Sequence, residues 1–273
     1  MHFADRLVEA VERSGSSLCV GLDPDPALMP RGVEVVEFCR GIVDAVACLA
    51  AAVKPQAAFF EALGPDGWAA LAEVCAYARE AGLLVIADGK RGDIGSTATA
   101  YAAAFAPIAD AVTVNAYLGR DSLEPFLARD GLGVFCLVKT SNPGSGDLQD
   151  VALADGTLLW QHVAALVREW GDDLVGESGL SRLGAVVGAT YPREVAHARE
   201  LMPRSVFLLP GVGAQGGRPE ELRAAFAPGP AGALVSASRS VIYAYRERGG
   251  DWRQAAAEEA ARLAGEVRAV AVA

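Results

Sequence analysis

Lys90 lies between two aspartates, Asp88 and Asp93, in the segment ADGKRGDIGST. A lysine between carboxylates is suited to stabilise a developing carbanion and then to protonate it, because the carboxylates favour the charged ammonium form. The same charge disfavours imine formation, which requires a neutral amine. An aspartate beside a substrate carboxylate would in addition favour loss of carbon dioxide. This spacing therefore predicts electrostatic and proton-transfer chemistry rather than covalent catalysis.

The chain has only three lysines, Lys54, Lys90 and Lys139, beside 21 arginines. Each lysine stands where an apolar run ends. Arginine stays charged at any usable pH and cannot deliver a proton, so the remaining lysines are candidates for that task. Compositional drift from lysine to arginine would explain their scarcity but not their placement.

We expect Lys54 to join Asp88, Lys90 and Asp93 in an alternating array of two ammoniums and two carboxylates. The alternative is a structural salt-bridge network. Burying four charges brings little net stability compared with apolar side chains, and such arrays are more often kept for function. We therefore interpret the array as catalytic.

Eight short apolar runs are separated by longer segments rich in alanine, leucine, glutamate and arginine. The runs lie at 17–22, 50–55, 83–88, 111–116, 132–139, 183–189, 206–211 and 233–238. They are nearly continuous rather than alternating, which is typical of parallel strands buried on both faces.

Eight such units without a break in composition predict an α/β fold, a (β/α)8 TIM barrel forming a single domain over residues 1–273. Residues 1–14 would be an extra N-terminal helix, and 251–270 the closing one. An open doubly wound sheet is the alternative, but no glycine-rich turn follows the first strand, and GVGAQGG at 211–217 lies too late in the chain.

Composition narrows the partners and the compartment. The net charge is −10 with no basic run, so nucleic-acid binding is not expected. Five scattered cysteines without a C-x-x-C pair indicate reduced thiols. The N-terminus carries acidic residues, unlike a signal or transit peptide, and the longest apolar stretch, 42–53, is too short to span a bilayer. We expect a cytoplasmic protein with no membrane partner.

Polar residues gather at the predicted carboxyl ends of the strands, where barrel enzymes carry their active sites. They are Asp23, Lys54, Asp88, Lys90, Asn115, Ser141, Thr190, Gln215 and Arg239. For Asn115 and Thr190 we favour a turn or helix cap. The segments PGVGAQGG and SASRS, after the seventh and eighth strands, predict a phosphate site; the alternative is a glycine-rich turn and a surface arginine. The three histidines fall at the terminus or in predicted helices, which leaves the proton to Lys90.

At these residues the chain resembles the orotidine 5′-phosphate decarboxylase family. The family signature D-x-K-x-x-D is present as Asp88, Lys90 and Asp93 and continues with Ile94 and Thr97. The segments VKPQAAFFE, KTSNPGS and PGVGAQGG are similar to those of the bacterial type 2 subgroup, so the resemblance covers essentially the whole barrel.

The resemblance implies decarboxylation of orotidine 5′-monophosphate to uridine 5′-monophosphate in de novo pyrimidine biosynthesis, without metal or cofactor. It implies that Lys90 donates the proton to the C6 carbanion and that Asp88 lies against the departing carboxylate. The implied substrate contacts are Lys54 and Asp23 at the ribose and charge array, Ser141 at the pyrimidine, and Gln215 with Arg239 at the phosphate, flanked by Pro210 and Ser238. Some relatives have glycine where this chain has Ser238, a departure that leaves room for the backbone contact but bears on its geometry. Asp93, Ile94 and Thr97 would enter the active site of a second protomer, giving a homodimer with shared sites.

Two other functions stay open from the residues alone. Related barrels use D-x-K-x-x-D in magnesium-dependent sugar-phosphate chemistry, but they carry a metal-binding carboxylate where this chain has Lys54. A non-catalytic phosphosugar- or nucleotide-binding regulator would not need the complete charge array. The loops at 143–150 and 171–182 are expected to be either a mobile lid or solvated turns.

Overall fold

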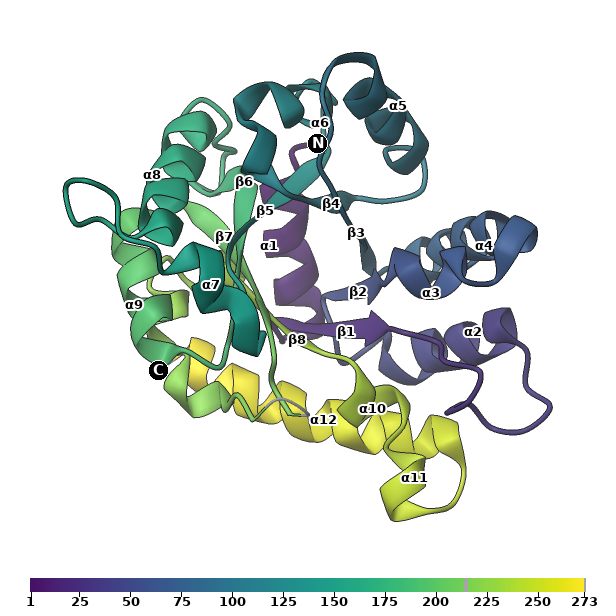
Figure 1. Ribbon diagram of the computed structural model, residues 1–273. Coiled ribbons are helices and arrows are strands. Elements are labelled where there is room, and N and C mark those ends of the chain that lie inside the picture. Colours follow the sequence, from purple (N-terminus) through teal and green to yellow (C-terminus); the bar gives the residue numbers. More distant parts are fainter. Residues whose placement is uncertain (214–215, 273) are drawn as a thin grey trace.

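The computed structural model describes residues 1–213 and 216–272. Eight parallel strands close into a barrel in sequence order, from β1 to β8 (Figure 1). They are β1 (Leu18–Leu22), β2 (Ala52–Pro55), β3 (Leu84–Arg91), β4 (Ala111–Val114), β5 (Gly133–Lys139), β6 (Ser181–Val187), β7 (Ser205–Pro210) and β8 (Ala233–Ala237). Each falls within or overlaps a predicted apolar run, and the predicted (β/α)8 barrel is confirmed.

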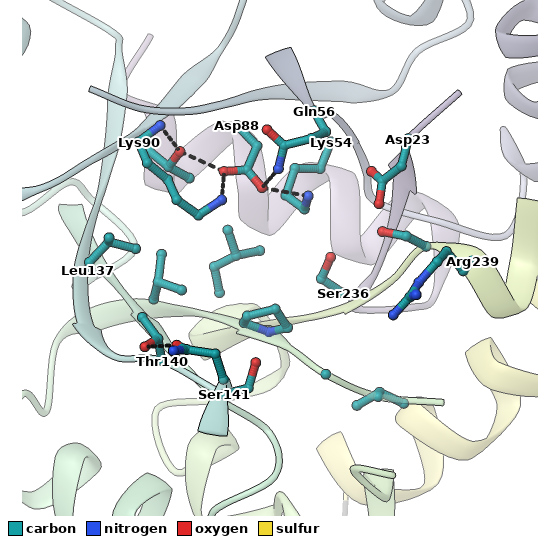
Figure 2. Close-up of a pocket in the computed structure, with 18 of the residues that line it drawn as sticks. Asp23, Lys54, Gln56, Asp88, Lys90, Leu137, Thr140, Ser141, Ser236 and Arg239 are labelled. Carbon is teal, nitrogen blue, oxygen red and sulfur yellow. Dashed lines mark hydrogen bonds and ion pairs between the residues drawn. The ribbon is translucent and has the colours of Figure 1, made fainter. Parts of the chain in front are cut away.

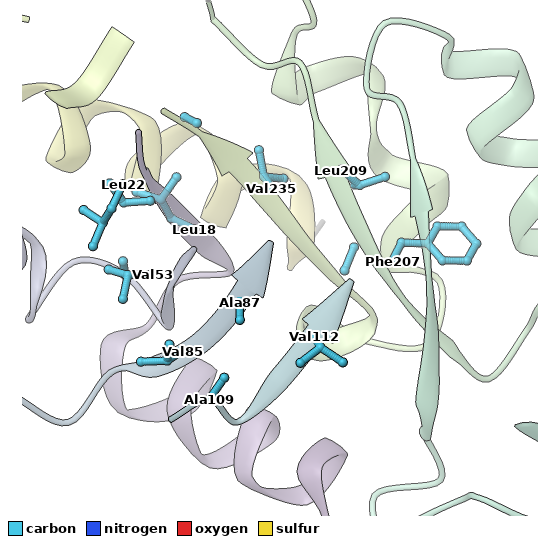
Figure 3. Close-up of a cluster of buried hydrophobic side chains, with 14 of the residues drawn as sticks. Leu18, Leu22, Val53, Val85, Ala87, Ala109, Val112, Phe207, Leu209 and Val235 are labelled. Carbon is cyan, nitrogen blue, oxygen red and sulfur yellow. The ribbon is translucent and has the colours of Figure 1, made fainter. Parts of the chain in front are cut away.

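Alternation along each strand divides its side chains between two environments, since successive residues point to opposite faces. Leu18, Leu22 and Val53 belong to the large cluster between the strands and the surrounding helices (Figure 3). Cys19 follows Leu18, Ala52 precedes Val53, and the two are paired across β1 and β2; both belong to a second cluster inside the barrel. This alternation decides which residues reach the mouth of the barrel.

The helices that surround the barrel are less regular than the strands. The longer ones are α2 (Val35–Val46), α4 (Gly67–Glu80), α5 (Gly95–Phe105), α8 (Leu159–Gly171), α9 (Pro192–Leu201) and α12 (Trp252–Ala271). The short ones are α3 (Ala57–Glu61), α6 (Glu124–Leu127), α7 (Gly146–Gln149), α10 (Arg239–Ile242) and α11 (Tyr245–Arg248). The predicted closing helix at 251–270 is α12, whose first turn is capped by the Asp251 carboxylate accepting from the N–H groups of Arg253 and Gln254.

One expected strand-plus-helix unit departs from the pattern. Between β7 and β8 the described residues form only the 3-10 helices η5 (Pro219–Glu221), η6 (Arg223–Phe226) and η7 (Pro230–Gly232). Pro219 stands in the first turn of η5, where proline is tolerated, whereas Pro228 and Pro230 limit how far a helix could extend from there.

The extra N-terminal helix α1 (Phe3–Ser14) closes the amino end of the barrel (Figure 1). Its buried side chains join the interior cluster, and Phe3 meets Phe135 of β5 edge to face at 5.9 Å between ring centroids. Bulk at this end leaves the opposite, carboxyl end of the strands as the open mouth.

Of the two alternatives expected for 171–182, a mobile lid is excluded, and the structure has turns there. This connection runs from α8 into the amino end of β6, so it lies at the α1 end of the barrel. The His2 ring lies 3.0 Å from the Leu174 carbonyl oxygen, and the Ser178 N–H donates to Asp5 at 2.8 Å. A helix-to-strand connection always returns to the end opposite the active-site loops, which is why its length carried no information about a lid.

Across the described residues, no helix combines the length and the apolar character that crossing a membrane requires.

Candidate active site

A cavity of about 640 Å³ opens at the carboxyl ends of the strands. The inward-facing residues near each strand end form its floor, and they come from seven different strands. They are Lys54, Asp88, Thr113, Leu137, Val186, Leu208 and Ser236. The two-residue period of the strands thus places two charged side chains and two hydroxyls at the bottom of a mostly apolar barrel.

Asp88 is the centre of a hydrogen-bonded array on this floor (Figure 2). Its Oδ2 atom accepts from Lys54 Nζ at 2.7 Å and from Gln56 Nε2 at 3.1 Å. Its Oδ1 atom accepts from Lys90 Nζ at 2.6 Å and from Thr113 Oγ1 at 2.8 Å. Four donors on one carboxylate hold it in a single orientation and favour its ionised form.

The two lysines differ in access to the cavity. The side chains of Lys54 and Asp88 are 6% and 7% exposed, whereas that of Lys90 is 43% exposed. Both ammoniums contact the same carboxylate, yet Lys90 alone of this trio presents a large part of its side chain to a ligand. Lys54 is therefore suited to hold Asp88, and Lys90 to meet a substrate.

The charges on this floor are fixed by their neighbours. Burial alone would raise the pKa of Asp88, but the ammoniums of Lys54 and Lys90 lower that pKa well below its ordinary value. Burial alone would likewise lower the pKa of Lys54, but the carboxylates of Asp88 and Asp23 raise that pKa above its ordinary value. The buried pair stays fully ionised at neutral pH.

The backbone departs from regular strand geometry at Lys90. Its φ angle is +45°, in the left-handed region that residues other than glycine rarely adopt. The pairing of β3 with β4 is irregular between Ala87 and Arg91. The Lys90 N–H donates to Thr113 Oγ1 at 2.9 Å, so one hydroxyl holds both this backbone and the Asp88 carboxylate. Asp88 and Lys90 do reach the same side, as predicted, but through an irregular strand end that stores strain.

Asp23, at the end of β1, faces the same cavity (Figure 2). Its Oδ1 atom is buried and has no hydrogen-bond partner among the described residues. A buried carboxylate oxygen without a donor is costly unless a ligand supplies one, which makes Asp23 a candidate to accept from a substrate hydroxyl.

The remaining walls carry the other predicted contacts. Ser141 lies with Thr140 across the cavity from the charge array, and Arg239 lies on the far side from Lys90 (Figure 2). Pro210 and Ser238 also line the cavity. Gln215, predicted to bind phosphate, lies outside the described residues.

Three predicted site residues do not line this cavity: Asp93, Ile94 and Thr97, at the start of α5. Ile94 and Thr97 are exposed, and the Asp93 carboxylate accepts from the neighbouring Ile94 N–H at 2.8 Å. The expected array of four charges therefore contains three of its members in one chain.

Sequence reasoning missed Gln56 and Thr113, both partners of Asp88. Gln56 stands two residues after Lys54, so the two-residue period was a usable signal for it. Thr113 lies one residue before the end of β4, in a run that looks purely structural. Asn115, which we expected to be a cap, does accept from the Tyr117 N–H at 3.0 Å.

Comparison with known proteins gives a consistent result along the chain. Residues 16–254 match the model of the "Orotidine 5'-phosphate decarboxylase / HUMPS family". The chain is 48% identical to the orotidine 5′-phosphate decarboxylase of Rhodopirellula baltica, over 90% of each protein. It is 48% identical to that of Roseiflexus castenholzii, over 96% of each. Among solved structures, the OMP decarboxylase of Leishmania donovani is 38% identical, covers all of both chains and superposes with a TM-score of 0.80.

Proposed function

The chain belongs to the orotidine 5′-phosphate decarboxylase family, and we propose that its barrel mouth converts orotidine 5′-monophosphate into uridine 5′-monophosphate, a step of pyrimidine biosynthesis. The observation that carries this assignment to individual residues is the pair of ammoniums on Asp88. It combines a fixed anion, a buried counter-ion and an accessible proton donor on one cavity floor.

The proposed reaction breaks the bond between C6 of the pyrimidine and its carboxylate carbon. Carbon dioxide leaves, the bonding electron pair remains on C6, and the Lys90 ammonium gives C6 a proton. Because Lys90 is the accessible member of the array, its charge lies where negative charge develops. Water then returns a proton to the neutral Lys90 amine.

Asp88 would lie against the departing carboxylate. Its pKa is held below the ordinary value by Lys54 and Lys90, so it remains an anion when a second anion is placed beside it. Repulsion between the two carboxylates is relieved as carbon dioxide departs, which favours the transition state over the bound substrate. Lys54 keeps Asp88 in place during this change.

We assign the remaining walls to substrate binding. Ser141 would contact the pyrimidine, Asp23 and Lys54 the ribose, and Arg239 the phosphate, together with Pro210, Gln215 and Ser238. Arg239 lies away from Lys90 across the cavity, as a nucleotide bound with its phosphate and its reacting base at opposite ends requires (Figure 2). A local arginine is needed here because the chain as a whole carries a net charge of −10.

We further propose a homodimer in which Asp93, Ile94 and Thr97 complete the site of the other protomer. Their position outside the cavity of their own chain, and the exposure of Ile94, support this arrangement. The proposal includes a single domain over residues 1–273, a cytoplasmic location, and no nucleic-acid or membrane partner.

Magnesium-dependent sugar-phosphate chemistry is disfavoured by Lys54, whose ammonium stands at the end of β2 where a metal-binding carboxylate would be needed. The decisive experiment follows the ultraviolet absorbance of orotidine 5′-monophosphate with the purified protein in EDTA. We expect full turnover, whereas loss of activity in EDTA that magnesium restores would overturn the metal-free mechanism.

The role of Lys90 is tested in the same assay with Lys90→Ala. We expect turnover to be abolished while binding of uridine 5′-monophosphate is largely retained, because Lys54 still holds Asp88. Near-normal turnover would refute the assigned proton donor, and a wild-type protein that binds nucleotide without turnover would indicate a regulator.

A further inference from the structure

Lys139, at the end of β5, has no part in the proposed reaction. Its side chain is 3% exposed, and its Nζ atom lies 2.7 Å from Asp150 Oδ1 and 3.4 Å from Ser145 Oγ. The ammonium also lies 5.4 Å from the centre of the Tyr191 ring. A buried ammonium is costly to maintain, so these contacts need a reason.

The chain between Lys139 and Asp150 is drawn into a closed loop. It passes through a 3-10 turn at Pro143–Ser145 and through α7, and then returns to β5. Beside the ion pair, Gln149 grips Thr140 twice. Its Oε1 atom accepts from the Thr140 N–H at 2.9 Å, and its Nε2 atom donates to Thr140 Oγ1 at 2.8 Å. The two ends of this loop, residues 139–150, are thus joined by adjacent pairs.

The same loop forms one wall of the cavity. Thr140, Ser141, Asn142 and Gln149 line it, and Figure 2 shows Thr140 and Ser141 facing the charge array from across the cavity. Lys139 and Asp150, which form the ion pair, immediately precede and follow the lining residues in the sequence. Whatever fixes the loop therefore fixes the wall.

We propose that Lys139 is a positioning residue of the substrate site: by joining Asp150 and Ser145 to the end of β5, it holds loop 139–150 so that Ser141 and Gln149 stand at the base-binding wall. This inference rests on the proposed function, since it assigns that wall to the pyrimidine. It also replaces the expected choice between mobile lid and solvated turn at 143–150 with a tethered wall.

The burial of the two partners gives the proposal a distinctive signature. Asp150 is 46% exposed, so Lys139→Met leaves a carboxylate that water solvates. Asp150→Asn leaves the ammonium buried without its counter-ion, which is the more costly defect. We expect Asp150→Asn to weaken nucleotide binding at least as much as Lys139→Met does. The double variant should weaken it no more than Asp150→Asn alone.

The test measures kcat and KM for orotidine 5′-monophosphate, together with inhibition constants for uridine 5′-monophosphate and inorganic phosphate. For Lys139→Met we expect KM and the nucleotide inhibition constant to rise roughly ten- to hundredfold, since displacing contact groups by about 1 Å has effects of this order. Inhibition by phosphate should not change, because Arg239 lies elsewhere in the cavity. Lys139→Arg should restore nucleotide binding, and Arg120→Met, which breaks an exposed ion pair with Glu124, is the matched control.

A purely structural role predicts a different result, namely fewer active molecules with an unchanged KM, and that result would overturn the proposal. Equal weakening of nucleotide and phosphate would overturn it as well. If Lys139→Met does not fold, Asp150→Glu gives the comparison from the exposed partner, because it keeps the counter-ion of Lys139 and changes only the length of the side chain that carries it. A wild-type protein that fails to convert orotidine 5′-monophosphate refutes the proposed function instead, and nucleotide binding by the variants then tests the tether independently.

Discussion

Replacing Lys54 by methionine should destabilise the folded protein far more than replacing Lys90, although both ammoniums contact Asp88 at nearly the same distance, 2.7 Å and 2.6 Å. Lys54 and Asp88 are buried together, and removing one partner of a buried pair costs about 3–5 kcal/mol. Lys90 is partly in water, where an ion pair contributes about 1 kcal/mol or less. We therefore expect the free energies of unfolding of the two variants to differ by several times the thermal energy.

The deficit of Lys54→Met should depend on pH with a defined sign. In the wild-type protein the pKa of Asp88 is depressed, so its contribution to stability is present above the unfolded pKa of about 3.9 and is lost as the pH falls through the lower folded pKa. Without Lys54 the folded pKa of Asp88 rises. The deficit should be full at pH 7 and should shrink by about 1.4 kcal/mol per pH unit once the pH falls below that raised pKa.

Urea unfolding followed by circular dichroism between pH 3 and pH 8 measures both effects. The variant Lys54→Met with Asp88→Asn removes both buried charges and should recover part of the loss. The reasoning would be refuted if Lys54→Met and Lys90→Met cost the same, or if the deficit of Lys54→Met were independent of pH.

Three further outcomes test separate parts of the site. Arg239→Ala should raise KM by roughly ten- to hundredfold with a smaller effect on kcat, because a hydrogen bond to a charged group contributes about 1.5–3 kcal/mol; an unchanged KM would place the phosphate elsewhere. Thr113→Val should lower kcat more than it raises KM, because the hydroxyl holds both Asp88 and the Lys90 backbone, and Thr113→Ser should restore kcat if the hydroxyl is what matters. Mixing the Asp93→Ala and Lys90→Ala proteins should produce activity that neither has alone. In each mixed dimer, the first protomer supplies Lys90 and the second supplies Asp93, so one of the two sites is intact. No activity after confirmed subunit exchange would argue against the shared site.

The barrel and most of its mouth were predictable because both follow from the local pattern of apolar runs along the sequence. Strands buried on both faces read as continuous apolar runs, and charged residues at the ends of the first, second, third and eighth runs line the cavity. Asp88, Lys90 and Lys54 needed nothing more than this. The contacts of Thr113 required the register of β3 against β4, which residue types alone do not contain.

Other features depended on long-range geometry. The positive φ of Lys90 arises where β3 becomes irregular against β4. Gly89 and Gly92 nearby indicate a turn, but residue types alone do not place the left-handed conformation at the lysine. At 171–182 the length of the segment left a lid and a turn equally open, whereas its position in the order of elements decides between them. Among the described residues between β7 and β8 there is no α-helix, and the prolines at 228 and 230 were a usable signal that any helix there would be short.

The helix α1 has a consequence for how the chain is made in the cell. Its apolar face meets Phe135 on β5, and just after it Ser17 donates to the Pro230 carbonyl oxygen at 2.6 Å. These partners leave the ribosome long after the first 14 residues do, by on the order of ten seconds or more at ordinary rates of synthesis. During that interval the apolar face of α1 has no native partner surface to cover it. The nascent chain is thus an expected client for chaperones that shield newly emerged segments, until the eighth strand arrives and the barrel closes.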